Sequence, residues 1–365
     1  MKSSNVKARV LVSLGIAVFI CIILSIAFIG RTKEETVKVG FIMSGSVDEN
    51  GWNGTHYQAI LNACKECGTQ LLVKENIEEF TGQCVTAIEE LVEEGANMIF
   101  LNSYGYSEEV SELVNEYPDV TFYANSSEYH AENMTSYFAR MYQARYLTGI
   151  IAGMKTESDK IGYVAAMSNN EVNRGINAFT LGVKSVNKDA TVVVTWTGSW
   201  DNEQAERQAT RSLIEGAGVD VVTYHQNQSY VIQEAEAKEV FSIGYHKQFE
   251  GFSDKYLTSA VYNLEPVYSE LVKEYMKGKG NSRTNYWIGI EKDAVGLSSY
   301  SDEVTAEARK AVDDAVAGML GGDDVFSGVI YDTQGNLRCS ENEIISDEIL
   351  LEQLDWFVEG VEFYE

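Results

Sequence analysis

Proline is almost absent from this chain of 365 residues, which contains only Pro118 and Pro266. No low-complexity tract occurs, and the 30 glycines are scattered over turn-like positions rather than gathered in a linker. These absences exclude a proline-rich or glycine-rich disordered chain, so we expect residues 36–365 to be folded. With 45% hydrophobic residues at this length, two domains are the expectation.

Basic side chains are scarce, and the formal net charge is −27. Residues 1–31 contain four basic and no acidic side chains, which leaves 24 basic against 55 acidic side chains after them, a formal charge of −31. Nucleic-acid binding depends on neutralising phosphates with lysine and arginine. The charge therefore argues against a nucleic-acid polymer as a partner.

The sequence also lacks the short motifs of common enzyme classes: G-x-S-x-G, H-E-x-x-H, G-x-x-x-x-G-K-[ST] and G-x-G-x-x-G are not found. We predict a protein that is not an enzyme and uses no cofactor. His56, His225 and His246 stand at predicted loop ends. Because they are far apart in the sequence, ligand contact or a structural role is the favoured hypothesis, and a metal site formed by them is the alternative.

Only five cysteines occur, and Cys64 and Cys67 form the sole C-x-x-C spacing. That spacing is found in redox pairs and in halves of zinc sites. Here it falls in a predicted helix without a second C-x-x-C, so a structural role is favoured. The disulfide state of Cys64, Cys67, Cys84 and Cys339 stays open.

Charge is missing from residues 10–29, which follow Lys2, Lys7 and Arg9. Residues 1–35 therefore indicate an export signal or a membrane anchor, and the length of the apolar run favours an uncleaved anchor. The basic residues before the run place the N-terminus inside and residues 36–365 outside the cytoplasm. Lipid attachment at Cys21 is disfavoured, because a bulky Ile20 precedes it.

Eight short runs of β-branched and aromatic residues predict buried strands. They are residues 37–43, 69–77, 97–103, 120–126, 160–166, 191–197, 219–225 and 240–246. Each is apolar on successive residues, which is typical of strands covered on both faces, and the alternation with helical patterns indicates parallel sheets.

Residues 84–98 and 207–222 share one plan: an amphipathic helix, then Glu-Gly, then a strand. This repeated pattern predicts two similar doubly wound domains with a boundary near residues 140–160. Such domains bind ligands in loops at the carboxyl ends of their strands.

The first of these loops is "SGSVDENGWNGTH", residues 44–56, in which Trp52 is placed to meet a ligand. Other strand ends also mix aromatic rings with amides and carboxylates. That mixture suits a flat hydrogen-bonding ring such as a nucleobase or nucleoside. The alternative is that Trp196 and Trp200 fill the interface between the lobes while the amides cap turns.

The segment "NNEVNRGINAFTLGVKSVNKDATVVVTWTGSW", residues 169–200, carries a resemblance to a known family. It is similar to a segment of the basic membrane protein family of ABC-transporter substrate-binding proteins, relatives of the purine nucleoside receptor. "ARYLTGIIAGMKT", "YPDVTF" and "DWFVEGV" also resemble that family, and the similarity covers roughly residues 37–363.

The resemblance implies a type I periplasmic-binding fold: two doubly wound parallel-sheet lobes, joined by three crossovers, that close on a ligand by hinge motion. The first lobe is expected at about 36–157 with a returning segment near 257–300, and the second at about 158–256 with C-terminal portions. The resemblance also makes Trp52 the base-stacking residue and Asp48 a loop-ordering or ligand-contacting carboxylate.

The sequence departs from the family pattern at two places. Gln248 stands where the family tends to have an aspartate expected near the sugar, and no lipid-attachment motif precedes Cys21. The first departure leaves a free base and a nucleoside both open as ligands. The second leaves the anchoring chemistry open.

The expected function is therefore extracytoplasmic binding of a purine base or nucleoside by a monomer that delivers it to an ABC permease. A sensor, or a receptor for another small polar molecule such as a sugar, is the alternative. The candidate ligand-binding residues are Asp48, Trp52, His56, Asn102, Tyr104, Glu171, Asn177, Trp196, Trp200, His225, Tyr245, Gln248 and Asn263.

Overall fold

The computed structural model describes residues 36–49, 51–127, 129, 131–280 and 285–364. The chain divides into two compact units, Met1–Val37 and Lys38–Glu365, and the fold described below is that of the second. The predicted apolar segment at residues 10–29 and Cys21 lie outside the described residues. Among the residues that are described, no helix has both the length and the apolar character needed to cross a membrane.

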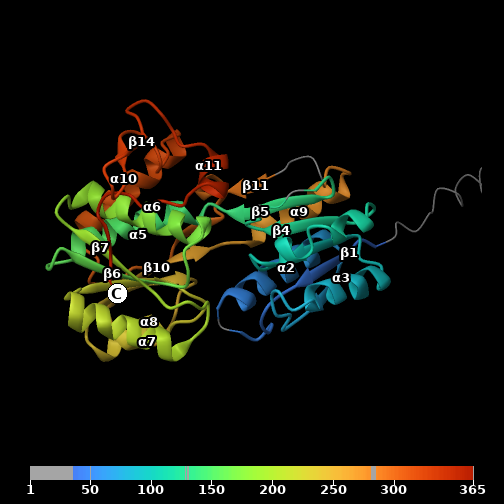
Figure 1. Ribbon diagram of the computed structural model, residues 1–365, viewed down its shortest axis with the longest axis horizontal. Helices are drawn as coiled ribbons and strands as arrows, with labels where there is room; N and C mark the ends of the chain where they lie inside the picture. Colours follow the sequence, from blue (N-terminus) through green and yellow to red (C-terminus); the bar gives the residue numbers. More distant parts are fainter. Residues whose placement is uncertain (1–35, 50, 128, 130, 281–284, 365) are drawn as a thin grey trace, which may run out of the picture. The chain divides into compact units, whose positions relative to one another are not determined.

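The first sheet contains six parallel strands in the order β11-β5-β4-β3-β1-β2 (Figure 1). Its strands are β1 Lys38–Ile42, β2 Gln70–Lys74, β3 Met98–Leu101, β4 Thr121–Asn125, β5 Met134–Ala139 and β11 Asn285–Ile288. Three longer helices belong with it: α2 Trp52–Cys67, α3 Gln83–Glu93 and α9 Glu265–Met276. We call this the first lobe.

The second sheet contains seven strands in the order β12-β10-β9-β8-β6-β7-β15, and only β12 runs antiparallel to its neighbour. Its strands are β6 Lys160–Ala165, β7 Thr191–Trp196, β8 Val221–His225, β9 Phe241–His246, β10 Tyr256–Tyr262, β12 Val295–Leu297 and β15 Val361–Phe363. The helices of this second lobe are α5 Met141–Lys155, α6 Asn170–Val186, α7 Glu203–Ser212, α8 Tyr230–Ala237 and α10 Ala306–Gly321.

All eight strands predicted from the sequence are present, as β1 to β4 and β6 to β9. Their residues are mostly buried, as expected for parallel strands covered on both faces. The helix predicted within residues 84–98 is α3, and Gly95 follows its end in the left-handed conformation at φ +85°. In the corresponding place of the second lobe, α7 continues into a π-helical turn, Leu213–Ala217, that ends at Gly218.

The chain passes between the two sheets three times: after β5, after β10, and between β11 and β12. Three segments differ from the lobe boundaries that we expected. Helix α5, expected in the first lobe, packs against α6. Strands β10 and β12, which fall in the expected returning segment, are part of the second sheet. The α5–α6 packing is close because Gly149 and Gly182 let the two backbones approach.

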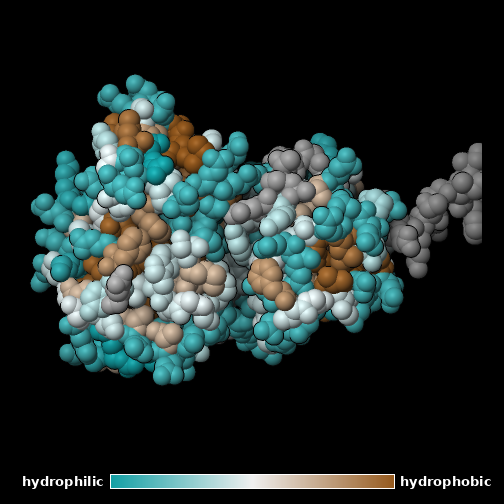
Figure 2. Space-filling model, viewed as in Figure 1, coloured by the Kyte–Doolittle hydropathy of each residue, from teal (hydrophilic) through white to brown (hydrophobic). Residues whose placement is uncertain are grey.

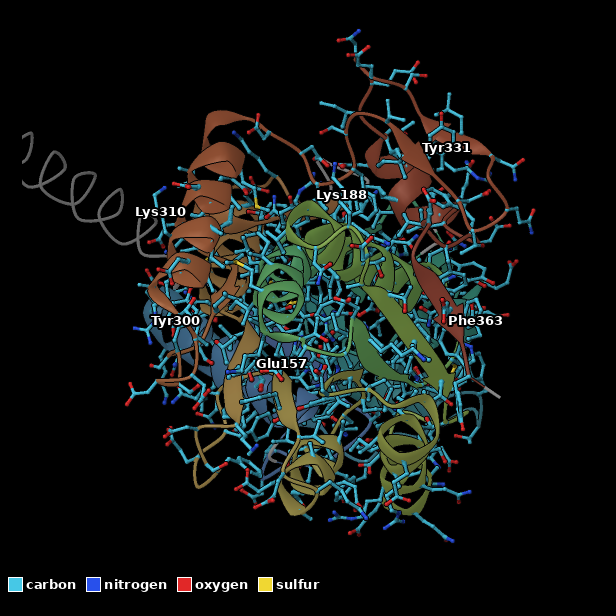
Figure 3. All side chains as sticks on the ribbon, turned by 90° about the vertical axis from the view of Figure 1, so that its left-hand side faces the viewer. Glu157, Lys188, Tyr300, Lys310, Tyr331 and Phe363 are labelled. Carbon is cyan, nitrogen blue, oxygen red and sulfur yellow. The ribbon has the colours of Figure 1, made fainter. Side chains whose placement is uncertain are left out.

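The C-terminal segment adds the hairpin β13 Ile330–Tyr331 and β14 Leu337–Cys339, and the short helix α11 Asp347–Glu352. Several apolar side chains are exposed around this hairpin, and Figure 2 shows the apolar surface there. The chain then returns to the second sheet as β15, whose Phe363 lies at the sheet edge (Figure 3). This returning strand ties the C-terminus to the second lobe.

Candidate functional site

Trp52 is the centre of an aromatic cluster to which both lobes contribute. It opens α2 directly after the polar loop that follows β1. Its ring centroid lies 3.9 Å from that of His56 and 6.1 Å from that of Phe138, both in the first lobe. From the second lobe, the rings of His246 and Tyr262 each lie 5.8 Å away. Trp52 therefore stands where the two lobes meet.

The first lobe holds this cluster with a network of hydroxyl and amide groups. Asn102, which follows β3, accepts hydrogen bonds at Oδ1 from the hydroxyls of Tyr137 at 3.2 Å and Tyr268 at 3.4 Å. Its backbone oxygen accepts one from the Trp52 indole at 3.1 Å. The Tyr268 hydroxyl also lies 2.6 Å from Nδ1 of His56. The position of the Trp52 indole is thus fixed by the buried Asn102 and His56 of the first lobe.

The second lobe contributes a matching set from the ends of β8, β9 and β10. The Tyr245 hydroxyl lies 3.0 Å from His225 Nε2 and 3.0 Å from the Tyr262 hydroxyl. Nε2 of His246 donates to the backbone oxygen of Gln226 at 2.7 Å, because a carbonyl oxygen can only accept. The neutral His246 ring therefore presents an acceptor at Nδ1.

Several buried polar atoms of this region have no hydrogen-bond partner among the described residues: His56 Nε2, Asn102 Nδ2, Arg145 Nε, His225 Nδ1, Gln226 Oε1 and His246 Nδ1. An unpaired buried donor or acceptor costs about 1–3 kcal/mol. Such atoms are rare in proteins and need an explanation when they gather in one place. Groups of this kind are what a buried polar ligand requires.

A small cavity lies beside the cluster and is lined by Phe138, Met141, Tyr142, Arg145, Glu171, Arg174, Gly175, His225 and Tyr245. Its volume of about 10 Å³ corresponds to about one water molecule. A larger ligand therefore enters only when the lobes or their side chains move apart. The lining comes from both sheets and from α5 and α6.

Burial keeps the three histidines of the site neutral. It lowers the pKa of His56 to about 3 and that of His225 to about 4, and it places the pKa of His246 well below its usual value. Burial also raises the pKa of the Tyr245 and Tyr262 hydroxyls above their usual range. At neutral pH these side chains act as uncharged hydrogen-bonding groups.

A second set of contacts joins the lobes at the rim of the site. The backbone nitrogen of Trp52 donates to Oδ1 of Asn227 at 2.9 Å, and Nδ2 of Asn227 donates to Glu49 at 2.5 Å. Gln228 donates to Asp201 at 3.2 Å. We call Glu49, Trp52, Asp201, Asn227 and Gln228 the rim bridge. It connects the loop after β1 with the loops after β7 and β8.

Seven of the predicted site residues lie in or next to the cluster: Trp52, His56, Asn102, Glu171, Trp200, His225 and Tyr245. Glu171 Oε1 lies 3.6 Å from His225 Nε2, and the Trp200 ring lies 6.1 Å from that of His225. Tyr104 is half-buried two residues beyond Asn102.

The remaining predicted residues lie elsewhere. Asp48 is exposed, and the neighbouring Glu49 makes the contacts across the lobes instead. Asn177 holds the C-terminal segment, because its amide bonds to the backbone of Trp356 and Val358. Trp196 packs on Phe357 and Phe363 at the sheet edge.

Gln248 and Asn263 also lie outside the cluster. Gln248 is exposed and bonds to Glu250 and to the backbone of Ser299. Asn263 is exposed and bonds to Asp293. Both residues follow strand ends of the second sheet, but neither lines the cavity.

Sequence reasoning missed Glu49, Phe138, Arg145, Arg174 and Tyr268, all of which contribute to the cluster, the cavity or the rim bridge. Tyr262, which precedes Asn263 at one of the aromatic strand ends considered in the sequence, also belongs to the cluster but was not among the candidates. Phe138 lies on β5, a strand that was not predicted. Arg145 and Arg174 lie on helices, where an isolated basic residue is usually taken as exposed. The buried apolar neighbours of Arg145 on α5 were the available signal.

The cysteines lie apart from this site. Cys64 and Cys67 lie on α2, Cys84 on α3 and Cys339 on β14, and all four are free thiols. Burial raises the pKa of the Cys64 thiol, which lowers its reactivity. Within the described part of the chain, no three His, Cys, Asp or Glu side chains are grouped so as to hold a metal ion.

Comparison with known proteins decides the family. The model of a family described as ABC transporter substrate-binding protein, PnrA-like, matches residues 36–318. The chain belongs to this basic membrane protein family. The family is described by its substrate-binding role in ABC transporters. The resemblance inferred from the sequence is confirmed.

Two relatives are similar over nearly the whole chain. A purine-binding protein of Brucella abortus (strain 2308) is 30% identical over 333 residues, which cover 90% of this chain and 94% of the relative. A protein of Haloferax volcanii, named as an ABC transporter glucose-binding protein, is 29% identical over 335 residues, which cover 91% of this chain and 82% of the relative.

Solved structures confirm the predicted fold. A transcriptional activator of the comK gene from Bacillus halodurans has a TM-score of 0.68 at 24% identity, covering 78% of this chain and 98% of that structure. An ABC transporter solute-binding protein from Aeropyrum pernix K1 has a TM-score of 0.67 at 17% identity, covering 78% of this chain and 92% of that structure. At these identities the similarity concerns the fold alone.

Proposed function

We propose that this family member binds a purine base or nucleoside between its two lobes outside the cytoplasm and delivers it to an ABC permease. The observation that supports the ligand is the Trp52 cluster, in which an aromatic ring is surrounded by buried polar atoms without partners. Stacking on an aromatic side chain contributes roughly 1–3 kcal/mol per base, and amide and imidazole groups can bind its edge atoms. The Brucella relative named as purine-binding is consistent with this ligand.

Closure of the lobes is the proposed binding step. A ligand shifts the open–closed equilibrium only by binding the closed form more tightly. The rim bridge stabilises a closed arrangement, and a base stacked on Trp52 would add contacts to both lobes. A ribose has no obvious partner at Gln248, which is exposed, so base and nucleoside are to be compared directly.

Residues 1–35 are proposed to export the protein and to hold it at the outer face of the membrane, either as an uncleaved anchor or until cleavage. The N-terminal residue of the protein recovered from cells distinguishes the two routes. An intact Met1 supports the anchor, and a new N-terminus within residues 20–40 supports cleavage.

A sugar is the second candidate ligand, because the Haloferax relative is named as glucose-binding and tryptophan faces also accept sugar rings. We would express residues 36–365, denature the purified protein and identify any released small molecule by mass spectrometry. The refolded protein would then be titrated with adenine, adenosine and glucose while its thermal stability is followed. A ligand at 1,000 times its dissociation constant adds about 4 kcal/mol to the free energy of unfolding.

We expect a purine to co-purify, or to be the compound that raises the melting temperature. Stabilisation by glucose, with no response to any purine, would overturn the ligand assignment and leave the fold intact. Uptake of the labelled ligand by cells with and without the gene then tests delivery to the permease. Unchanged uptake together with tight binding would indicate a sensor instead.

A further inference from the structure

The C-terminal segment, residues 319–364, begins where the match to the family model ends. It is fixed to the second lobe by side-chain amides of α6. The amide of Asn173 donates to the backbone oxygen of Leu354 at 2.9 Å, and the amide of Asn177 donates to that of Trp356 at 2.9 Å. Helix α11, which lies within this segment, is therefore carried by the second lobe.

Helix α11 holds two arginines that belong to other elements. In its first turn, both carboxylate oxygens of Asp347 accept hydrogen bonds from Arg140, from Nη1 at 2.8 Å and from Nη2. Towards its other end, the backbone oxygen of Leu350 accepts one from Nη1 of Arg174 at 2.6 Å. Arg140 stands at the first crossover, between β5 and α5, and Arg174 is part of α6. The two-point contact with Asp347 fixes the plane of the Arg140 guanidinium group.

Both arginines lie against one tryptophan of the first lobe. Trp287 is on β11, the edge strand of the first sheet, and Figure 1 shows this strand beside α11. The guanidinium carbon of Arg140 lies 4.3 Å from the centroid of the Trp287 ring, and that of Arg174 lies 4.8 Å from it. A cation at such a distance is attracted to an indole face. We call Arg140, Arg174, Trp287 and Asp347 the hinge cluster, because its contacts join the two lobes.

The hinge cluster reaches the wall of the cavity. Arg174 and Tyr142 both line the cavity. The Tyr142 hydroxyl accepts a hydrogen bond from Nη1 of Arg140 at 3.1 Å, and its ring lies 5.3 Å from that of Trp287. The backbone nitrogen of Arg140 also donates to the backbone oxygen of Ile288 at 2.6 Å, which ties the crossover to β11. A shift of β11 relative to α11 therefore displaces groups that line the cavity.

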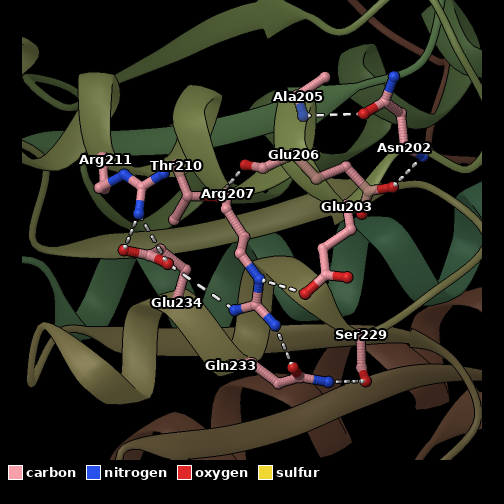
Figure 4. Close-up of polar contacts among 10 residues, drawn as sticks. All are labelled: Asn202, Glu203, Ala205, Glu206, Arg207, Thr210, Arg211, Ser229, Gln233 and Glu234. Carbon is pink, nitrogen blue, oxygen red and sulfur yellow. Dashed lines mark hydrogen bonds and ion pairs between the residues drawn. The ribbon is translucent and has the colours of Figure 1, made fainter.

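Ion pairs within a single lobe differ from the pair of Asp347 with Arg140. Figure 4 shows two arginines of α7, one paired with Glu203 of the same helix at 2.9 Å and the other with Glu234 of α8 at 3.4 Å. Such pairs move as one body when the lobes rotate, so they do not affect closure. The Asp347–Arg140 pair joins α11 to a crossover, and the cluster touches the first lobe. A contact made more strongly in one of two forms shifts their equilibrium.

We propose that Asp347 is a positioning residue for lobe closure. Through Arg140 it holds the hinge cluster against Trp287 in the closed arrangement, which raises the closed population and with it the ligand affinity. The proposal gives the C-terminal segment a role in binding, although none of its described residues lines the cavity. It rests on the proposed closure of the lobes and is independent of the ligand's identity.

The first test measures closure without a ligand. The backbone nitrogen of Trp52 donates to Asn227 across the lobes, so hydrogen exchange at this amide reports opening of the rim bridge. In the full-length protein, purified in detergent, Asp347→Asn should speed exchange in the peptide containing Trp52 by about 2- to 5-fold, the effect of losing a partly exposed ion pair. Asp347→Glu, which keeps the charge, should restore slow exchange.

The second test measures affinity. Adenine, adenosine and glucose are titrated separately, and the dissociation constant of whichever compound binds should rise in Asp347→Asn by the same factor as the exchange rate. The reason is that apparent affinity scales with the fraction of the protein in the binding-competent form. Asp347→Glu should again resemble the wild-type protein.

Glu303→Gln is the matched control. Glu303 pairs with Lys155 at 2.6 Å within the second lobe, and the exposed fractions of the two side chains, 47% and 20%, resemble the 53% and 19% of Asp347 and Arg140. This variant should leave exchange at Trp52 unchanged. Faster exchange in α11 of Asp347→Asn, with unchanged exchange at Trp52, would show that Asp347 stabilises α11 alone and would overturn the proposal.

A further variant covers the case in which Asp347→Asn does not fold, as judged by circular dichroism. Trp287→Phe then decides, because phenylalanine attracts cations less strongly than tryptophan. It should also speed exchange at Trp52, and unchanged exchange would overturn the proposal. If the Asp347 variant loosens the rim bridge but none of the three compounds binds, the ligand assignment fails and the role of Asp347 stands.

Discussion

Trp52, at the start of α2, and Trp196, at the end of β7, are both half-buried, but their neighbours differ. Trp52 touches rings from both lobes, and its indole nitrogen bonds to Asn102 in the first. The ring of Trp196 lies against those of Phe357 and Phe363, near the end of the chain. The same residue type thus has a proposed ligand-binding role in one place and a packing role in the other.

Replacing Trp52 by alanine should therefore weaken purine binding by about tenfold or more, because stacking contributes roughly 1–3 kcal/mol. Trp196→Ala is the matched control and should leave the affinity nearly unchanged while lowering thermal stability. Titration calorimetry on both variants measures the difference. Equal affinities of Trp52→Ala and the wild-type protein would remove Trp52 from the site.

The buried histidines predict how stability depends on pH. The pKa of His56 falls from its ordinary 6.5 to about 3 on folding, so below pH 6.5 the unfolded chain binds a proton that the folded chain does not. The stabilisation is complete above pH 6.5 and is lost as the pH falls towards 3. Glu206 has the opposite effect on stability, because burial raises its pKa from 4.5 to about 8. Between these pH values the folded chain binds a proton that the unfolded chain does not, so the free energy of unfolding increases as the pH falls.

Because several groups contribute to the pH dependence of the wild-type protein, the effect of His56 is measured by comparing the free energy of unfolding of His56→Gln with that of the wild-type protein. As the pH decreases from 6 to 4, the free energy of unfolding of the wild-type protein should fall more steeply than that of His56→Gln. The difference between the two slopes should be about 1.4 kcal/mol per pH unit. Urea denaturation at several pH values gives both slopes. Parallel curves would show that His56 is protonated in the folded protein.

At the scale of secondary-structure elements, the packing of α5 on α6 decides which lobe α5 joins. A side chain on Gly149 would collide with the backbone oxygen of Phe179, and one on Gly182 with that of Tyr146. The helices therefore meet backbone to backbone. Helical periodicity showed that α5 is a buried helix, but it carries no information about the sheet that covers it.

Gly149→Ala should destabilise the protein by about 1–3 kcal/mol, because overpacking forces the two helices apart. Gly321→Ala provides the control, since Gly321 ends α10 and a side chain there would meet open space. That substitution should be neutral or stabilising by up to about 1 kcal/mol, owing to the better helix propensity of alanine. Thermal denaturation of both variants measures the contrast, and equal effects would contradict the packing argument.

At the scale of the whole molecule, the loop after β1 lies against the loop after β8. Gly51 lies directly against Asn227, and a side chain on Gly51 would collide with the backbone oxygen of Asn227. The absence of a side chain at this position is therefore a condition for the rim bridge and for the closed arrangement of the lobes.

Gly51→Ala should hinder closure and so reduce purine affinity without a comparable loss of stability, because the collision exists only in the closed form. Gly296→Ala is the control, since a side chain there would meet open space. Small-angle scattering should show the radius of gyration decreasing on ligand addition in the wild-type protein and in the control. The same decrease in Gly51→Ala would refute this role for Gly51.

Local patterns in the sequence were sufficient for much of the fold. Strands buried on both faces show as continuous apolar runs, and α3 shows as an apolar stripe ended by Gly95. The motifs in residues 169–200 were sufficient for the family. The loop containing Trp52 could be singled out because it follows the first parallel strand.

Tertiary structure alone decided which strand-end side chains meet. Arg145, Phe138 and Tyr262 reach the site because the chain crosses between the sheets three times, a property of contacts that lie far apart in the sequence. Gln248 follows a strand as Asn102 does but bonds to Glu250, and Asn177 lies within α6 and bonds to the backbone of Trp356. Sequence periodicity therefore determines which residues are buried in strands and helices, whereas the site depends on long-range packing and on the closure of the two lobes.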